Sequence, residues 1–228
     1  LPVWSSYDRI VSISPEAGQG FLSRFPELED RLLAMENIVS PRAVREQAAL
    51  EDVSAVMEGS PCLCTVGRFS HAKGMDRAVR IAARLVEMGM KGLRWYLAGY
   101  GDEASLRREI AAHGMEEHVV ILGKKANPYP YMAACGLYVQ PSRYEGKAVA
   151  VREAQILGRP VAITRFPTAS GHLEDGVDGV IVPNDEEGAA QALFSLLHDP
   201  ARLESLAAAC RARDYGNRDE ILKLEALV

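Results

Sequence analysis

The sequence has no long apolar run. No stretch approaches the roughly 18 consecutive apolar residues that a membrane-spanning helix needs, and the first residues do not form a signal peptide. We therefore expect a cytoplasmic chain that does not span a membrane, with peripheral contact at the inner membrane face only through a full-length protein. The first residue is Leu rather than Met, which suggests a fragment of a longer protein.

Strong charge of one sign is also missing. The chain carries 31 acidic and 26 basic residues, a net charge of −5. A general attraction to nucleic acid is therefore not expected, although a local basic pocket is compatible with this balance. No Asp-x-Asp pair is suited to holding a metal ion. The sequence predicts no nucleic-acid partner and no metal site.

Cysteine is scarce, with only Cys62, Cys64, Cys135 and Cys210. A Cys-x-Cys pair without a second pair or nearby histidines is a poor zinc signal. We interpret all four as buried thiols of a protein in a reducing compartment. The hydrophobic content of 48% over 228 residues supports a well-packed core, in one large domain or in one domain plus part of another.

Short apolar runs alternate with helix-like segments from residue 61 onward. Helical spacing of apolar residues is clear between Met75 and Val86, and each run ends in a loop with glycine or small polar residues. This alternation predicts parallel βαβ units in a doubly wound, Rossmann-like α/β sheet, with a flavodoxin-like domain as the alternative fold. The predicted strands are residues 63–66, 93–98, 119–122, 137–140, 160–164 and 177–182.

Residues 1–57 have a different pattern. Residues 8–14 and 32–38 are predicted strands, and Ser14 followed by Pro15 is typical of a capped helix start. Residues 42–57 are interpreted as helix or linker. This segment therefore contains the elements of one βα unit ahead of the regular alternation.

The stretch 141–154, PSRYEGKAVAVREA, carries the most chemistry. Glu145 and Gly146 should lie where a strand gives way to a helix, and the unpaired amides and dipole of a helix start favour an anion. Lys147 is expected in the first helical turn, where a cation is unfavourable unless an anion neutralises it. Glu145 and Glu153, the latter about two turns into the helix, suit hydroxyl groups. An anion site for phosphate beside two carboxylates for hydroxyl groups fits a nucleotide-sugar. On spacing alone, a surface loop with two solvated glutamates is the alternative.

These residues resemble a known family. Glu145 and Glu153, separated by seven residues, resemble the Glu-x7-Glu motif of the family 4 retaining glycosyltransferases, which have the GT-B fold. The loop VGRFSHAKG, residues 66–74, resembles the family's Val-Gly-Arg…Lys-Gly loop. The resemblance covers residues 61–198. It implies the carboxy-terminal, donor-binding half of a hexosyltransferase that uses a UDP- or GDP-linked sugar and a glycan or lipid-linked acceptor, with retention, in polysaccharide assembly.

The resemblance also implies residue roles. Arg68 and Lys73 would contact the donor's diphosphate and, with the helix start after Gly146, take the place of a metal, so no metal or other cofactor is implied. Glu145 would bind hydroxyls of the transferred sugar, and Glu153 those of the ribose. The implied catalytic residues are Glu145, Arg68 and Lys73. The wider donor-binding set adds Gly67, Gly99, Gly123, Lys124, Gly146, Lys147, Ala148 and Val149.

By the same resemblance, residues 1–57 are the tail of an amino-terminal acceptor domain plus a linker, and residues 58–228 are the nucleotide-sugar-binding domain. The rest of the acceptor domain, with its catalytic histidine, would be missing, so the isolated chain is expected to transfer little or nothing. The sequence departs from the family at Lys147-Ala148, where many members have Phe-Gly. A nucleotide-sugar epimerase of the same fold and a non-catalytic nucleotide-binding module are the alternatives.

Overall fold

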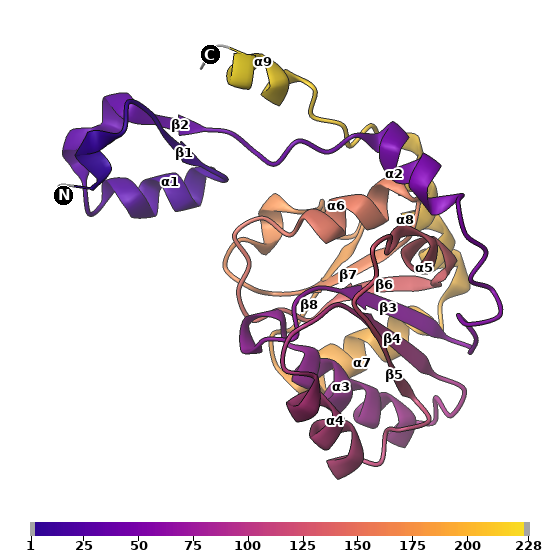
Figure 1. Cartoon of the computed structure of the whole chain (residues 1–228). Helices are drawn as coiled ribbons and strands as arrows, with labels where there is room; N and C mark the ends of the chain where they lie inside the picture. Colours follow the sequence, from indigo (N-terminus) through magenta and orange to yellow (C-terminus); the bar gives the residue numbers. More distant parts are fainter. Residues whose placement is uncertain (1–2, 226–228) are drawn as a thin grey trace.

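A computed structural model of the chain describes residues 3–225. Its main body is an α/β domain built on a six-stranded sheet in the order β5-β4-β3-β6-β7-β8, with every pairing parallel (Figure 1). The predicted doubly wound sheet is therefore confirmed. Its strands are β3 (Cys62–Val66), β4 (Arg94–Ala98), β5 (Val119–Gly123), β6 (Leu137–Gln140), β7 (Val161–Thr164) and β8 (Val180–Val182).

Helices cover both faces of this sheet. Helices α3, α4 and α7 lie on one face, and α5 and α6 on the other (Figure 1). Helix α8 packs against both α6 and α7 and so closes the layer along one side. The bounds are α3 (Met75–Glu87), α4 (Glu103–Ala112), α5 (Tyr129–Ala134), α6 (Val149–Ile156), α7 (Glu186–Leu197) and α8 (Pro200–Ala212).

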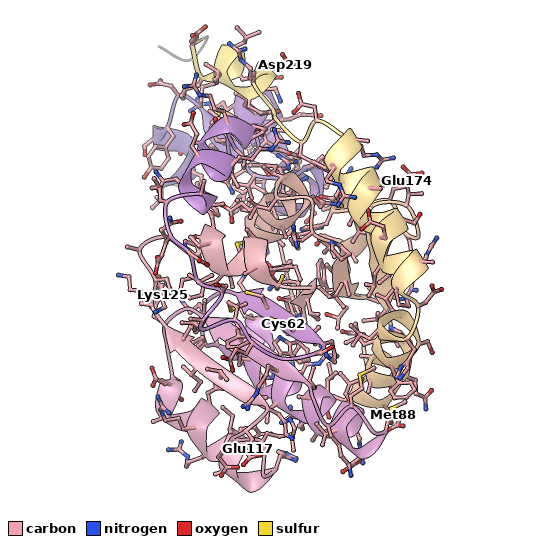
Figure 2. All side chains as sticks on the ribbon, turned by 90° about the vertical axis from the view of Figure 1, so that its right-hand side faces the viewer. Cys62, Met88, Glu117, Lys125, Glu174 and Asp219 are labelled. Atoms are coloured by element: carbon pink, nitrogen blue, oxygen red, sulfur yellow. The ribbon has the colours of Figure 1, made fainter. Side chains whose placement is uncertain are left out.

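Alternation along the strands divides the core into two clusters. Leu63 and Leu137 pack with α3 and α7, whereas their neighbours Cys64 and Tyr138 pack with α5 and α6. Both faces are apolar because successive side chains of a strand point to opposite sides and both sides are covered. Figure 2 shows side chains filling the space between the sheet and the helices on each side. All four cysteines are free and buried, as expected.

A smaller body precedes the domain. It contains β1 (Ile10–Ser12), α1 (Pro15–Leu22), a 3₁₀ helix (Pro26–Arg31) and β2 (Leu32–Ala34), with β1 and β2 paired in parallel. The predicted cap is confirmed, because the Ser14 side chain accepts from the Ala17 amide. Both predicted strands are present but were drawn too long. The first strand ends before Ser14, because Ser14 caps helix α1. The second ends near Met35, because the next amide, that of Glu36, donates to the Glu220 carboxylate rather than to a strand.

An extended connection joins the two bodies. It leads from β2 to α2 (Pro41–Ala48), and the last helix, α9 (Asp219–Glu225), lies above it (Figure 1). The Asn217 side chain donates to the Asn37 carbonyl and accepts from the Val39 amide, at 2.9 Å each. The carboxy-terminal segment is thereby fixed to this connection. Within residues 3–225, no helix has the length and apolarity needed to span a membrane.

The strand order reverses between β3 and β6. From β3 the chain proceeds outward to β4 and β5, then returns to the other side of β3 to form β6, β7 and β8. The loops after β3 and β6 therefore lie side by side at the carboxyl edge, at the reversal of strand order where such sheets bind ligands. The predicted last strand started too early: residues 175–179 form a turn, with Gly176 at a φ of +80° and the Asp175 carboxylate accepting from the Ile181 amide.

Candidate functional site

Two loops meet at this edge of the sheet, and an ion pair joins them. Lys73 ends a short 3₁₀ helix (His71–Lys73) after β3, and its Nζ lies 2.6 Å from Oε2 of Glu145, which follows β6. Only 3% of the Glu145 side chain is exposed. Its other oxygen accepts from Ser142 Oγ at 2.6 Å and Gln140 Nε2 at 3.2 Å. Glu145 is thus a buried carboxylate held by three donors, not a solvated loop residue.

Close backbone contact holds the same two loops together. Gly74 has a φ of +67°, and a Cβ at this position would overlap the carbonyl of Pro141. The Arg143 amide also donates to the Ala72 carbonyl at 2.8 Å. Only glycine accommodates both the left-handed backbone and this approach. Gly67 lies at the start of this loop, with its amide bonded to the Ala98 carbonyl.

Arg68 extends from the β3 loop toward the next loops of the sheet. Its guanidinium donates to the Tyr100 hydroxyl at 3.3 Å and lies 5.4 Å from the ring centre, while the Lys124 Nζ lies 5.5 Å from the same centre. The hydrogen bond from Arg68 lowers the pKa of Tyr100. Tyr100 is half exposed and therefore presents a ring flanked by two cations. Sequence reasoning marked its flanking glycine, Gly99, but not the ring itself.

Glu153 lies in a more apolar setting than expected. Its carboxylate accepts from the Tyr129 hydroxyl at 2.8 Å. Burial raises the pKa of Glu153, and burial together with this hydrogen bond raises the pKa of Tyr129 to about 12. Helix α6 begins at Val149, so Glu153 lies little more than one turn into it rather than about two. The solvated pair of glutamates considered from spacing is wrong for both residues.

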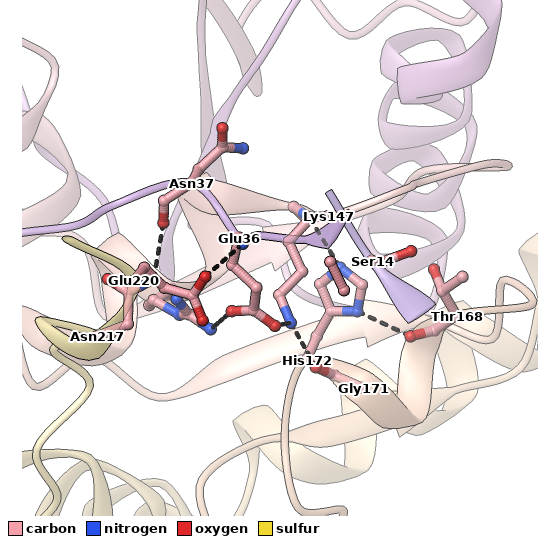
Figure 3. A network of polar contacts seen from close by, with 12 residues as sticks. Ser14, Glu36, Asn37, Lys147, Thr168, Gly171, His172, Asn217 and Glu220 are labelled. Carbon is pink, nitrogen blue, oxygen red and sulfur yellow. Dashed lines mark hydrogen bonds and ion pairs between the residues drawn. The ribbon is translucent and has the colours of Figure 1, made fainter. Parts of the chain in front are cut away.

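Lys147 precedes α6 instead of lying in its first turn. Its Nζ lies 2.6 Å from Oε1 of Glu36, and Arg152 contacts the other oxygen of Glu36 at 2.6 Å (Figure 3). Burial acts to raise the pKa of Glu36, but the bonds from these two cations outweigh it and the pKa is lowered. The anion that Lys147 requires is therefore supplied by the connection between the two bodies. No local sequence pattern marks Glu36 for this contact.

The start of α6 is also bound from the loop after β7. The Ala148 amide donates to His172 Nε2 at 2.8 Å, and the Thr168 hydroxyl donates to the Glu145 carbonyl at 2.8 Å. His172 was not identified from the sequence. One amide of the predicted anion-binding helix start thus already has a partner within the chain.

The site residues predicted from sequence form neighbouring groups along one edge of the sheet. Lys73 meets Glu145, Arg68 and Lys124 meet around Tyr100, and Lys147 meets Glu36. Gly123 ends β5 at this edge, with a φ of +71°. Among residues 3–225, no cluster of three or more His, Cys, Asp or Glu side chains is placed to hold a metal ion. The arrangement places several cations and two buried carboxylates along this edge.

Comparisons with known proteins agree with this fold and show the family. The family model described as Glycosyl transferases group 1 matches residues 60–199. Alpha-D-kanosaminyltransferase of Streptomyces kanamyceticus is 30% identical over 168 residues, which is 72% of this chain and 42% of that protein. A variant of S. aureus TarM in complex with fondaparinux, alpha-GlcNAc-glycerol and UDP superposes with a TM-score of 0.81 and 17% identity, over 98% of this chain and 44% of that one.

A second solved structure shares the fold. Anabaena Alr3699/HepE in complex with UDP superposes with a TM-score of 0.78 and 17% identity, and covers 96% of this chain and 63% of that one. The chain thus spans less than half of the kanosaminyltransferase and less than two thirds of either structural neighbour.

Proposed function

The chain belongs to the glycosyl transferases group 1 family, and from this premise we propose that it is the donor-binding part of a retaining glycosyltransferase. Its donor would be a nucleotide-diphosphate hexose, UDP- or GDP-linked, and its acceptor a glycan or lipid-linked glycan of a cell-surface polysaccharide. Residues 58–228 would form the donor domain, and residues 1–57 the tail of an acceptor domain with its linker. The full-length protein would act in the cytoplasm, in peripheral contact with the membrane.

The observation that carries the proposal is the Lys73–Glu145 contact at the reversal of strand order. Lys73 follows β3 and Glu145 follows β6, so the cation that we propose for the phosphates and the carboxylate that we propose for the sugar hydroxyls meet where a doubly wound sheet receives its ligand. A donor with its diphosphate on the β3 side and its sugar on the β6 side fits this order. UDP in the structural neighbours supports a uridine nucleotide as the first ligand to test.

The chemistry assigned to these residues is stabilisation of the leaving group. Sugar transfer breaks the bond from C1 of the sugar to the diphosphate oxygen, and the electron pair stays on that oxygen. The acceptor oxygen forms the new bond on the same face, and its proton passes to the departing phosphate. Arg68 and Lys73 would neutralise the growing charge, and each ~1.4 kcal/mol of stabilisation gives about a tenfold rate gain.

The contacts of Glu145 are also compatible with a second candidate function, that of a non-catalytic nucleotide-binding module. Lys73, Ser142 and Gln140 all donate to its carboxylate, which would also be expected of a purely structural residue in a nucleotide-binding module. Replacement by glutamine in the full-length protein separates the two. Both candidates predict that nucleotide affinity is unchanged by Glu145→Gln. A transferase has transfer activity before the replacement and loses it, whereas a binding module has no transfer activity in either form.

Calorimetric titration of the 228-residue chain with UDP, GDP and ADP tests the proposal. We expect one nucleotide to bind and Arg68→Ala to weaken it tenfold or more, about 1.4 kcal/mol. Arg107→Ala is the matched control, because Arg107 is exposed on α4 and, among residues 3–225, its side chain pairs only with Glu103 in its own helix. Equal affinities for Arg68→Ala and the unmodified chain would contradict the phosphate role of Arg68. Absence of binding to all three, in the full-length protein as well, would reject the donor-binding proposal.

A further inference from the structure

His172 lies where the loop after β7 meets the start of α6. It follows a short 3₁₀ helix (Ala169–Gly171), and its ring packs edge-on against Phe166 with centres 5.2 Å apart. Figure 3 shows the ring beside Lys147, with its second nitrogen directed to Thr168. The residue is therefore part of the wall behind the candidate site, and the proposed chemistry does not use it.

Two hydrogen bonds define its protonation state. The Ala148 amide is a donor only, so Nε2, 2.8 Å away, must accept. The Thr168 carbonyl is an acceptor only, so Nδ1, 2.8 Å away, must carry the proton. The geometry thus requires a neutral imidazole in the Nδ1–H tautomer. A protonated ring has a donor at both nitrogens and would place one N–H against another at Ala148.

Burial favours the neutral ring, and the surrounding charges act in both directions, since Lys147 and Arg152 lower the pKa of His172 whereas Glu145 raises it. Lys147 and Arg152 face it from the start and the body of α6, Glu145 from the loop before the helix and Glu16 from α1. Burial lowers the pKa of His172, the bond to Thr168 opposes this, and the two cations lower it further. Glu36 already neutralises both cations through its own contacts.

The same loop is connected to the candidate site at a second point. Thr168, which accepts from His172, donates through its hydroxyl to the Glu145 carbonyl at 2.8 Å. Glu145 and Ala148 are therefore both fixed by the loop after β7, one through Thr168 and the other through His172. Loss of the His172–Ala148 bond would leave the amide at the start of α6 without its acceptor, while Thr168 would still hold the Glu145 carbonyl.

We propose that His172 is a positioning residue of the donor site, acting as a neutral hydrogen-bond acceptor that fixes the start of α6 and is disabled by protonation. The inference rests on the proposed donor-binding function. Protonation of His172 at low pH would then weaken donor binding, although His172 does not itself touch the donor. Glutamine is the informative replacement, because its amide oxygen can accept from Ala148 and does not titrate.

The test is titration with UDP between pH 8 and pH 5 for the 228-residue chain and its variants. We expect His172→Gln to bind UDP as the unmodified chain does at pH 8 and about fivefold more tightly at pH 5, which corresponds to one ordinary hydrogen bond. Ionisation of UDP itself affects both proteins equally and cancels in the comparison. His118→Gln is the control: its Nδ1 also bonds a backbone carbonyl, that of Leu93, but at the amino-terminal edge of the sheet. Identical pH profiles for His172→Gln and the unmodified chain would overturn the proposal.

Nitrogen-15 NMR of the histidine side chains provides a readout independent of ligand. We expect the His172 spectrum to show a protonated Nδ1 and a bare Nε2 at neutral pH, and the Ala148 amide to exchange faster once that ring protonates. An Nε2–H tautomer would overturn the inference even if UDP binds. If no variant binds UDP at any pH, UDP is not a ligand of this chain, and these spectra still decide whether His172 holds Ala148.

Discussion

Glu36 and Lys147 form an ion pair of 2.6 Å between two parts of the chain that are 111 residues apart in sequence. Glu36 belongs to the connection that leaves the small amino-terminal body, whereas Lys147 lies at the start of α6 beside the candidate site. Arg152 bonds the second oxygen of the same carboxylate at 2.6 Å. An anion from the chain therefore occupies cations that a diphosphate would otherwise attract.

The first prediction concerns this competition. Glu36→Gln removes the negative charge without changing side-chain size, so Lys147 becomes available to the diphosphate. We expect the Kd for UDP to fall about fivefold, since a half-buried ion pair contributes ~1 kcal/mol. Calorimetry measures it, with Glu46→Gln, an exposed glutamate paired only within α2, as the control. Weaker binding by Glu36→Gln would instead mean that Glu36 orients Lys147 for the donor.

The second prediction concerns the Lys73–Glu145 pair. Lys73→Met leaves a carboxylate that is 3% exposed without its cation, and we expect the free energy of unfolding to fall by roughly 2 kcal/mol. The figure lies below that of a fully buried pair because 31% of the Lys73 side chain is exposed. Lys73→Met combined with Glu145→Gln should recover part of the loss. Urea unfolding gives these values.

The exposed pair of Arg42 and Glu46 is the control for the Lys73 and Glu145 replacements. Their side chains are 87% and 60% exposed, so Arg42→Met should cost less than ~0.5 kcal/mol. An equal cost for Lys73→Met and Arg42→Met would show that the Lys73 contact contributes no more than a surface pair.

The third prediction separates steric overlap from backbone strain. Gly74 and Gly114 have φ values of +67° and +62°, but a Cβ at Gly74 would overlap the Pro141 carbonyl whereas a Cβ at Gly114 has open space. Gly114→Ala should cost about 1 kcal/mol of stability, the strain of a left-handed alanine. Gly74→Ala should cost ~2 kcal/mol more and also weaken UDP binding, because the two loops must separate. Thermal unfolding of both variants provides the comparison, and equal costs would disprove the close approach.

The fourth prediction concerns pH and Glu153. Its pKa is raised above the ordinary value of 4.5, so the folded protein holds this proton more tightly than the unfolded chain. The stability that Glu153 contributes is therefore complete below pH 4.5 and is lost as the pH rises through its raised pKa. We expect Glu153→Gln to gain stability relative to the unmodified chain from pH 4 to pH 7, as measured by urea unfolding. A constant difference across that range would contradict the raised pKa.

Tyr129 offers a direct check on the same pair. Burial and the bond to Glu153 raise its pKa to about 12, and removal of the carboxylate in Glu153→Gln should lower it. Ultraviolet titration of the tyrosines, with Tyr129→Phe to assign the signal, would detect this change.

The sequence alone was sufficient for the parallel sheet and for placing Lys73 and Glu145 in one site, but it did not predict the direct contact between them. Both faces of the sheet are covered, so the strands are short apolar runs that are easy to recognise. Lys73 and Glu145 follow two such runs, and parallel strands bring the ends of both to one edge. The end of β1 and the start of β8 were less predictable. Serines after β1 and an Asp-Gly turn before β8 form local hydrogen bonds, which limit the length of each strand.

Glu36 and His172 could not be found in this way. Glu36 lay inside a predicted strand, and its role depends on how the small body meets α6. In the sequence His172 is one loop residue among others. Its proposed role follows from its two ring nitrogens, each of which lies 2.8 Å from a backbone group. Such contacts follow from three-dimensional placement and leave no spacing or periodicity in the chain.

Asn217 has a mechanical consequence. The chain crosses between the two bodies once before α2 and once ahead of α9, and the Asn217 amide holds both crossings together at Asn37 and Val39. This single side chain therefore cross-links two segments that lie 178 to 180 residues apart in sequence. The Glu36–Lys147 ion pair ties the same connection to the start of α6, so a ligand that displaced Glu36 from Lys147 would also weaken the attachment of the connection to the domain.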